Sequence, residues 1–457
     1  MNLIVMGGGI AGLTAAVRAT QLGKRVVVLE KGLDTAYPCN SRFTGGAMHI
    51  CYRDPTSDPA ILRAAIENAT VGTARPDLAD AMAANAGRVL DFLRSQGAHF
   101  IKGGAEEYKR WVLTPMRPQS RGLYWRGRSG DVMLRSLERT LTQGGGVLHR
   151  GARVTRAERR DDGWFVQTEG GKEFTAENLI IADGGFQANN SILRQHISPR
   201  PESILQRGAR TGMGDGLQLA IGLGARTIGM NRFYGHIMLA DALQRDDLWP
   251  YPWLDPVASS GIVVDSQGNR FVDEGKGGIH IANVVARLED PLSTWTIFDS
   301  AIWQGPGARG MVPPNPNFNL AGINLPQADT LEALAAQIGL DAGKLVNTVQ
   351  TYNAALAAGR TEQLTPPRKS AGAMPIAQAP FRAARLVPGI TYTMGGIEID
   401  GNARVIHQDG TVIEGLYAAG TAAGGLEGGP DGGYVGGLMK SVMTGLKAAE
   451  HMASRTT

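Results

Sequence analysis

The chain begins with a glycine-rich loop of the kind that holds a dinucleotide. Gly7, Gly9 and Gly12 form a G-x-G-x-x-G pattern, with Ala11 between the last two. The first glycine permits a tight turn, the second lets the backbone approach a pyrophosphate, and the third allows close helix–strand packing. Glu30 follows 23 residues after Gly7. Its carboxylate can accept hydrogen bonds from a ribose 2′-hydroxyl and would repel a 2′-phosphate, which disfavours NADP.

The segments around this loop have the pattern that such a site requires. The apolar run 3–6 predicts a strand before the loop, and residues 10–22, rich in alanine, predict a helix after it. Residues 25–29 are apolar after Arg25 and mostly β-branched, which is typical of a buried parallel strand. The helix N-terminus would offer free N–H groups and a partial positive charge to phosphates. The first thirty residues therefore predict a βαβ unit that binds a dinucleotide.

Composition and charge exclude several other classes of protein. The chain has 457 residues, which favours two or three domains. Its 46 Lys+Arg nearly balance 42 Asp+Glu, and no basic run stands out, so we expect no nucleic-acid partner. Cys39 and Cys51 are too few for a four-cysteine iron–sulfur site, and no haem-attachment motif is present. With no secretory signal or apolar span visible, we expect a cytoplasmic protein.

Several segments spread along the chain resemble one flavoprotein family. Residues 176–185 and 415–420 are similar to cofactor-contacting strands of glutathione-reductase-like flavoproteins. Four more segments resemble loop motifs of the fumarate reductase/succinate dehydrogenase flavoprotein superfamily: 40–47, 211–216, 268–274 and 391–396. The resemblance covers nearly the whole chain. Residues 261–264, 273–275 and 433–437 look closest to tricarballylate dehydrogenase-like proteins.

The resemblance implies an FAD-dependent enzyme that oxidises or reduces a carbon–carbon bond next to a carboxylate. Choosing FAD over NAD rests on this resemblance. Together with the loop, it implies a set of cofactor-binding residues: Gly7, Gly9, Ala11, Gly12, Glu30, Lys31, Asn40, Ser41, Arg42, Thr44, Gly45, Gly46, Val154, Ala182, Asp183, Gly184, Gly214, Asp215, Gly420, Gly437 and Leu438. Members of the superfamily can attach FAD covalently through a histidine of the flavin-side loop. Because His49 does not stand in the expected motif, we predict non-covalent FAD.

The chain also departs from the family pattern. True fumarate reductases and succinate dehydrogenases carry histidine where this chain has Tyr392, and an arginine acid near position 275, where this chain has Gly-Lys-Gly-Gly. The arginine of their C-terminal loop is missing as well, since residues 428–437 contain none. These departures make fumarate or succinate an unfavourable substrate.

Dehydrogenation of a carbon–carbon bond needs a proton-transfer group and donors for the charge that develops on a neighbouring carbonyl. Family positions nominate Tyr392, Thr393 and His236 for these roles, with Glu274 and Lys276 where the family runs a proton path. Tyr434 is a further candidate, because the glycines around it would let its side chain reach over a ligand. Each has a plain structural alternative, such as a buried tyrosine, a satisfied histidine or a surface ion pair. Arg42 is expected to neutralise FAD or substrate, whereas Arg126 and Arg128 are interpreted as solvated loop residues.

We expect an α/β fold in which a Rossmann-like, glutathione-reductase-like FAD-binding domain carries an inserted α+β capping domain. The predicted boundaries are 1–235 and 376–457 for the FAD-binding domain and 236–375 for the cap. Two rival functions stay open: a desaturase of cyclic ketones that resembles 3-ketosteroid dehydrogenases, and a non-catalytic flavin-binding subunit of an electron-transfer complex. The predicted substrate is a small anionic or carbonyl compound. Electrons would leave to a separate acceptor, a quinone or an electron-transfer protein, since a second complete dinucleotide motif is missing.

Overall fold

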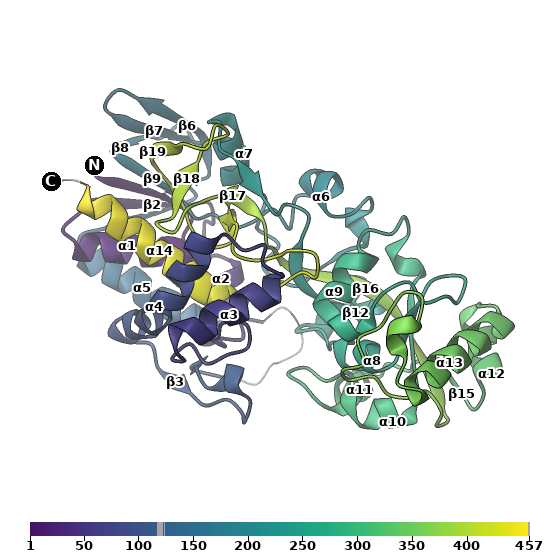
Figure 1. Cartoon of the computed structure of the whole chain (residues 1–457). Helices are drawn as coiled ribbons and strands as arrows, with labels where there is room; N and C mark the ends of the chain where they lie inside the picture. The colour runs from purple at the N-terminus through teal and green to yellow at the C-terminus, as the bar shows by residue number, and fades with distance from the viewer. Residues whose placement is uncertain (117–121, 123, 456–457) are drawn as a thin grey trace.

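The computed structural model describes residues 1–116, 122 and 124–455, and its elements form two lobes that lie side by side (Figure 1). The first lobe holds both chain termini and contains a six-stranded sheet in the order β18-β19-β9-β1-β2-β5. All neighbouring strands of this sheet are parallel except the edge pair β18 and β19. The strands are β1 Leu3–Met6, β2 Val26–Glu30, β5 Val147–Arg150, β9 Asn178–Ile181, β18 Arg404–Ile406 and β19 Val412–Ala418.

Helices cover this sheet, whose central strands are apolar except for Glu30 at the end of β2 and Asn178 at the start of β9. Every residue of β1 and β2 is buried, as expected of parallel strands that are packed on both faces. Helix α1 packs against α5 and α14, and α14 also packs against α4. An antiparallel sheet of β6, β7 and β8 is inserted between β5 and β9. The bounds are α1 Ile10–Gln21, α4 Pro76–Ser95, α5 Ser129–Gln143, α14 Gly437–Ser454, β6 Val154–Arg160, β7 Gly163–Thr168 and β8 Glu173–Ala176.

Three glycines of the first loop have three different surroundings. A Cβ on Gly12 would lie 2.0 Å from the carbonyl oxygen of Gly7, so this glycine lets α1 approach the loop. Gly7 has φ +103°, and a Cβ there would lie 2.6 Å from the carbonyl oxygen of Ala182. A Cβ on Gly9 would meet only the Ser41 hydroxyl, at 3.5 Å. The loop is therefore packed tightly at Gly7 and Gly12 and is open at Gly9, where a ligand can approach.

The second lobe is built on a sheet in the order β10-β16-β14-β13, and β12 and β15 also pair with β16. Helices α8 to α13 surround this sheet on the right of Figure 1. The strands are β10 Leu205–Gln206, β12 Phe233–Leu239, β13 Ile262–Val264, β14 Trp295–Phe298, β15 Gln327–Ala328 and β16 Phe381–Thr393. The helices are α8 Asp255–Ser260, α9 Gly278–Val285, α10 Ser300–Gln304, α11 Pro314–Leu320, α12 Leu331–Ile338 and α13 Ala342–Ala357.

The second sheet takes strands from outside the predicted cap, 236–375. Strand β16 falls in the segment expected to return to the FAD-binding domain, yet it pairs with β10, β12, β14 and β15. Strand β10 likewise precedes the predicted boundary. A strand's own residue pattern predicts that it is a strand, but the pattern does not specify which sheet it joins.

A β-bulge near the end of β16 turns two successive residues toward the other lobe. Tyr234 of β12 pairs with Tyr392, whereas the next residue, Gly235, pairs with Ile390, so Thr391 is the extra residue. A bulge breaks the alternation of side chains along a strand. Thr391 and Tyr392 consequently line the same pocket, which is described below.

The remaining elements connect the two sheets. A small sheet is formed by β11, β17 and β20, and a second one by β3 and β4. Their bounds are β3 Phe100–Ile101, β4 Val112–Leu113, β11 Thr227–Ile228, β17 Gly396–Glu398, β20 Ala423–Gly424, α2 Asn40–Phe43, α3 Pro59–Thr70, α6 Asn190–His196 and α7 Asp215–Gly222. Among the residues that the structure describes, no helix has both the length and the apolar character needed to cross a bilayer.

Candidate active site

One pocket, which we call the loop pocket, lies at the carboxyl ends of β1, β2 and β9 and includes Gly7, Gly9 and Ala11. The first turn of α1 opens beside it: the Ile10 N–H donates to the Ser41 hydroxyl at 3.0 Å, and Gly9 supplies no side-chain cap. Glu30 stabilises the loop, because its carboxylate accepts hydrogen bonds from the N–H groups of Gly8, at 2.8 Å, and Gly32, at 2.7 Å. These glycines and helix N–H groups fit the pyrophosphate of a dinucleotide.

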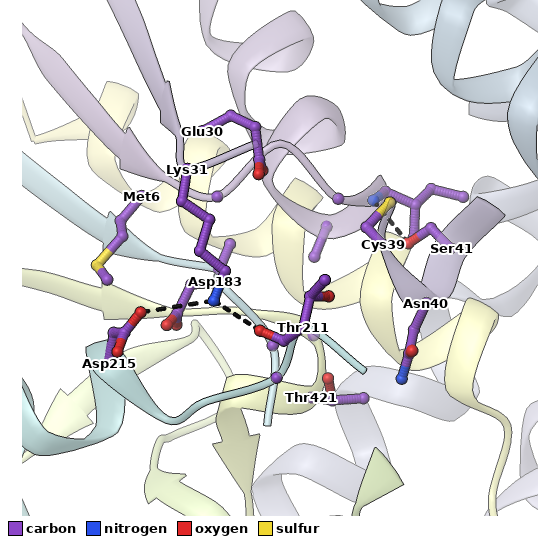
Figure 2. A pocket seen from close by; sticks show the side chains of 18 of the residues that line it. Met6, Glu30, Lys31, Cys39, Asn40, Ser41, Asp183, Thr211, Asp215 and Thr421 are labelled. Carbon is purple, nitrogen blue, oxygen red and sulfur yellow. Dashed lines mark hydrogen bonds and ion pairs between the residues drawn. The ribbon is translucent and has the colours of Figure 1, made fainter. Parts of the chain in front are cut away.

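On the opposite side of the loop pocket, Lys31 bridges two segments of the chain. Its Nζ donates to the carbonyl oxygen of Thr211 at 2.6 Å and lies 3.5 Å from the carboxylate of Asp215 (Figure 2). Asp183 also lines the pocket, and its Oδ1 is a buried oxygen without a hydrogen-bond partner. Burial, as the largest cause, raises the pKa of Asp183 to about 6. Asp183 therefore contributes a carboxyl group to the polar lining of the pocket.

Most of the predicted cofactor residues line this pocket or the one next to it. The loop pocket is lined by Gly7, Gly9, Ala11, Glu30, Lys31, Asn40, Ser41, Val154, Ala182, Asp183, Gly184, Asp215 and Gly420. The adjoining pocket is lined by Thr44, Gly45, Gly46, Gly437 and Leu438, and also by Asn40 and Ser41. Gly12 and Gly214 line neither pocket: Gly12 serves helix packing, and Gly214, at φ +74°, is the N-cap of α7.

Arg42 requires a correction, because the structure places it away from both pockets. Its side chain is completely buried and forms ion pairs with Asp131 and with Glu138, the latter at 3.1 Å. The guanidinium also lies 4.8 Å from the ring centre of Tyr37. These two carboxylates already neutralise the charge, so Arg42 joins α2 to α5 and is not a group that neutralises FAD or substrate.

The adjoining pocket, which we call the aromatic pocket, is continuous with the loop pocket. Both are lined by Ile10, Asn40, Ser41, Thr421 and Ser441. The aromatic pocket has a volume of about 320 Å³, which is within the range of small-molecule sites. Ten of its lining residues are aromatic or histidine: Phe43, His49, Tyr52, Tyr108, Tyr234, His236, Trp249, Trp253, Tyr392 and Tyr434. A ligand that spans both pockets would therefore place its far end among aromatic rings.

His236 and Tyr434, two of the predicted catalytic residues, meet at Tyr234. The rings of Tyr234 and Tyr434 are stacked with centres 4.0 Å apart. The Tyr234 hydroxyl lies 3.1 Å from Nε2 of His236, whose Nδ1 lies 2.6 Å from Oδ2 of Asp255. His236 also stacks on Trp253 with ring centres 3.8 Å apart. The sequence predicted His236 and Tyr434 but gave no signal for Tyr234 or Asp255.

Tyr392 lines the aromatic pocket, but its hydroxyl is engaged elsewhere. It donates to the carboxylate of Glu427, at 3.0 Å to Oε1. That buried carboxylate also accepts from the N–H groups of Val435 and Gly436 and forms an ion pair with Lys440 at 3.2 Å. Burial, followed by the nearby Glu427 charge, raises the pKa of Tyr392 well above its usual value. The contacts therefore assign Tyr392 to positioning the turn before α14 and not to proton transfer.

Three other predicted catalytic residues lie outside the aromatic pocket. The Thr393 hydroxyl is buried and accepts a hydrogen bond from the Phe186 N–H at 3.3 Å. Glu274 is completely buried and forms ion pairs with Arg270, at 2.6 Å, and Arg368, at 3.1 Å, so it belongs to the core of the second lobe. Lys276 forms an ion pair with Asp431 at 2.7 Å. The predicted proton path requires a connection between Glu274 and Lys276, and the described contacts show none.

Two arginines of the aromatic pocket stand out because they lack acidic partners. Arg128, interpreted from the sequence as a solvated loop residue, is only 6% exposed. Its guanidinium lies 5.0 Å from the ring centre of Trp249, and its Nη1 has no hydrogen-bond partner. Arg207 donates from Nη1 to the Thr391 hydroxyl at 2.6 Å, and its Nε has no partner. Neither forms an ion pair within the part of the chain that the structure describes. Two such cations create a site for an anion.

A dinucleotide loop that leads into an aromatic reaction pocket is the arrangement expected of a flavin-dependent dehydrogenase or reductase. The chain belongs to the FAD binding domain family, whose model matches residues 2–434. FAD is its cofactor, and it is an oxidoreductase that acts on CH–CH groups. The predicted membership of the fumarate reductase/succinate dehydrogenase flavoprotein superfamily is thereby confirmed.

Known proteins of similar sequence and structure agree with this assignment. The chain is 26% identical to 4-oxocyclohexanecarboxylate 2-dehydrogenase of Sinomonas cyclohexanicum, over 92% of this chain and 87% of the relative. It is 25% identical to NADH:fumarate oxidoreductase of Klebsiella pneumoniae (strain 342), covering 92% of this chain but only 44% of that longer protein. The fold matches the solved 3-ketosteroid-Δ4-(5α)-dehydrogenase of Rhodococcus jostii RHA1 with a TM-score of 0.73 and 22% identity, covering 99% and 96% of the two chains.

Proposed function

We propose that this enzyme oxidises, or in reverse reduces, a carbon–carbon bond in a small organic acid that also carries a carbonyl group. The observation that carries the proposal is a pair of cations in an otherwise aromatic pocket: Arg128, which is buried, and Arg207, which is partly exposed, neither of which forms an ion pair within the described residues. A guanidinium without a partner is costly to bury, and a substrate carboxylate would compensate it through charge-assisted hydrogen bonds.

The rest of the pocket supports a substrate with a second polar end. Tyr234, Tyr434 and His236 bring hydroxyl and imidazole groups to the pocket, and these suit a carbonyl and the acidic C–H next to it. The relative from Sinomonas acts, by its name, on a molecule that has both a ring ketone and a carboxylate. We extend that combination of groups to this chain as a substrate class. Nearness to tricarballylate dehydrogenase-like proteins stays a prediction.

FAD would be held with its ADP half in the loop pocket and its ring end near the residues common to both pockets. When bound, it supplies an acceptor for the hydride at flavin N5.

We propose that the first lobe is a Rossmann-like, glutathione-reductase-like domain, capped by an inserted domain whose limits lie near 205 and 393 rather than 236 and 375. Burial lowers the pKa of His49 to about 4, and its Nδ1 accepts the Tyr52 N–H at 3.2 Å; these contacts support non-covalent FAD. Electrons would pass to a separate quinone or electron-transfer protein.

A second candidate, desaturation of a cyclic ketone without an acid group, is favoured by the stacked pair Tyr234 and Tyr434. Stacked phenols could donate to a ketone oxygen whether or not the substrate is charged. The two candidates differ in one respect only, namely whether Arg128 and Arg207 bind a carboxylate.

An anaerobic reduction assay separates these functions. Purified holoenzyme is mixed with 4-oxocyclohexanecarboxylate, cyclohexanone, cyclohexanecarboxylate, succinate or androst-4-ene-3,17-dione, and bleaching of the flavin is followed. We expect rapid bleaching by 4-oxocyclohexanecarboxylate alone. Equal bleaching by cyclohexanone or the steroid would favour the ketone desaturase, and bleaching by none of the five would overturn the proposed substrate class.

A further inference from the structure

Tyr234, His236 and Asp255 form a hydrogen-bonded series that ends in the aromatic pocket. Tyr234 and His236 lie on strand β12, and Asp255 is the first residue of α8. Asp255 Oδ2 lies 2.6 Å from His236 Nδ1, while its Oδ1 accepts the Ile237 N–H at 2.9 Å. His236 Nε2 lies 3.1 Å from the Tyr234 hydroxyl. Tyr234 and His236 line the pocket, but Asp255 does not.

The direction of each hydrogen bond follows from the chemistry of the groups. Burial lowers the pKa of His236, so its imidazole is neutral near pH 7. A carboxylate accepts only, so Nδ1 carries the proton and donates it to Asp255. Nε2 is then an acceptor, and the Tyr234 hydroxyl donates to it. The lone pairs of the Tyr234 oxygen then remain to accept the hydrogen bond of Tyr434 and a proton from the pocket.

We propose that Tyr234 is the proton-transfer group of the reaction, and that His236 and Asp255 act as the relay that takes up its proton. This inference rests on the proposed function. In the oxidative direction, the substrate C–H bond next to the carbonyl breaks, and its electron pair remains on the substrate as an enolate. The released proton bonds to the Tyr234 oxygen while the Tyr234 hydroxyl proton moves to Nε2 of His236. The imidazolium that forms lies against the Asp255 carboxylate.

The other tyrosines of the pocket are less suited to this role. The Tyr392 hydroxyl already donates to Glu427. Tyr434 accepts the Gly437 N–H at 3.4 Å, and its ring lies flat against Tyr234, which places it as a donor to the substrate carbonyl or to Tyr234. Burial raises the pKa of Tyr234 to about 12, with Arg207 opposing this effect. A phenol with that pKa is not ionised at rest and needs an acceptor for its proton, which His236 provides, as the histidine of a serine-hydrolase triad does.

The position of His236 is fixed from all sides, as a relay requires. Trp253 stacks on its ring at 3.8 Å with an angle of 13° between the planes. The charged or titratable groups that face it are Asp255, Tyr234 and Arg207. Asp255 favours the imidazolium and Arg207 opposes it. His236 can therefore hold a proton transiently without being charged at rest.

The first test measures proton transfer without oxidation. Holoenzyme with its flavin reduced beforehand under anaerobic conditions is incubated in D₂O with 4-oxocyclohexanecarboxylate, and deuterium uptake next to the ketone is followed by mass spectrometry. General acid–base groups contribute about 10²- to 10⁴-fold. We expect Tyr234→Phe to slow enzyme-catalysed exchange at least about 100-fold and Asp255→Asn about 10-fold or more, while FAD content and the ligand's Kd change less than about threefold.

Tyr417→Phe is the matched control. Tyr417 also forms a hydrogen bond with a histidine, His451 Nδ1 at 3.0 Å, but it lies in the first lobe and lines neither pocket. Its exchange rate should equal that of wild type. Exchange by Tyr234→Phe within threefold of wild type, while the ligand still bleaches oxidised flavin, would overturn the relay and leave the proposed function standing.

A second measurement needs no ligand. In holoenzyme labelled with ¹⁵N-histidine, His236 should show an unprotonated Nε2 and a protonated Nδ1 between about pH 6 and 8. Asp255→Asn, whose amide can donate to Nδ1, should shift the signals toward the other tautomer, whereas Tyr417→Phe should not. A protonated Nε2 in wild type would refute the relay whatever the substrate screen finds.

Discussion

Replacing Arg128 by methionine tests whether this buried arginine exists to bind substrate or to stabilise the fold. The guanidinium is 6% exposed, lies over Trp249, and has a terminal nitrogen without a partner. Methionine keeps much of the apolar stem and removes the charge. Binding and stability should therefore change in opposite directions.

The size of the binding effect follows from the interaction that is removed. A hydrogen bond from a buried charged group contributes about 1.5–3 kcal/mol, and about 1.4 kcal/mol corresponds to tenfold. Arg128→Met should thus lower kcat/KM for a ketoacid by about 10- to 150-fold, mostly through KM. For cyclohexanone, which has no carboxylate, kcat/KM should stay within about threefold or rise.

The stability effect has the opposite sign to that of an ordinary buried ion pair. Without ligand, Arg128 is desolvated with no carboxylate to compensate it, so methionine should leave the Tm of the ligand-free enzyme unchanged or raise it. Arg42→Met is the control. It removes the buried partner of Asp131 and Glu138, which keep only Arg135, at 3.1 Å, and Arg150, at 2.7 Å, so we expect a loss of up to about 3–5 kcal/mol.

Steady-state kinetics on the two ligands and thermal unfolding of Arg128→Met, Arg42→Met and wild type decide the question. Arg42→Met should lower Tm, and its surviving folded fraction should keep the KM of wild type. If Arg128→Met lowers Tm as much as Arg42→Met does and leaves KM for the ketoacid unchanged, Arg128 is structural and the carboxylate proposal loses its main support.

Three further predictions concern the cofactor and its electrons. Gly9→Val should abolish FAD retention while the apoprotein still folds, because the space beside Gly9 is open to the pocket. Gly12→Ala should instead impair folding, since its Cβ would meet the Gly7 oxygen at 2.0 Å. A280/A450 ratios measure FAD retention and circular dichroism measures folding, so the two variants can be distinguished. Burial raises the pKa of Asp183 from 3.8 to about 6, so the folded apoprotein binds this proton more tightly than the unfolded chain and loses the resulting stability as pH rises from about 4 to 6. Asp183→Asn should therefore match the wild-type Tm near pH 4 and exceed it above about pH 6. Equal Tm values at about pH 7 would contradict the assignment. Artificial acceptors should support turnover and NAD or NADP should not, so fast steady turnover with NAD alone in pure enzyme would sink the proposal of a separate acceptor.

The parts of this molecule that local sequence predicts well are those in which neighbouring residues determine the structure. The run 3–6 is strand β1, and the helix predicted over 10–22 is α1 at Ile10–Gln21. The glycine spacing located the loop pocket because Gly12 packs against the nearby Gly7 and Gly9 leaves space for a ligand, although the contact of Gly7 with Ala182 is distant in the sequence.

The reaction pocket was harder to predict because its groups come from distant segments. Arg128 precedes α5, Arg207 follows β10, and Asp255 opens α8. No spacing in the sequence relates them, and a lone arginine is most often a solvated side chain. The bulge at Thr391 had no local signal either, yet it decides that Thr391 and not Thr393 faces the pocket.

The positions of Arg128 and Arg207 in the pocket say more about the chemical groups of the substrate than the presence of two positive charges does. The superfamily resemblance implies an arginine in the loop before the last helix, where this chain has Tyr434 stacked on Tyr234. The positive charge comes instead from Arg128 and Arg207, on other segments of the pocket wall. Arg128 lies over Trp249, whereas Arg207 also faces Tyr234 and His236. Succinate carries a carboxylate on each reacting carbon and has no carbonyl for the phenols. A molecule with both a carbonyl and a carboxylate can use the phenols and the arginines of the pocket at once, which is why a ketoacid is the better expectation.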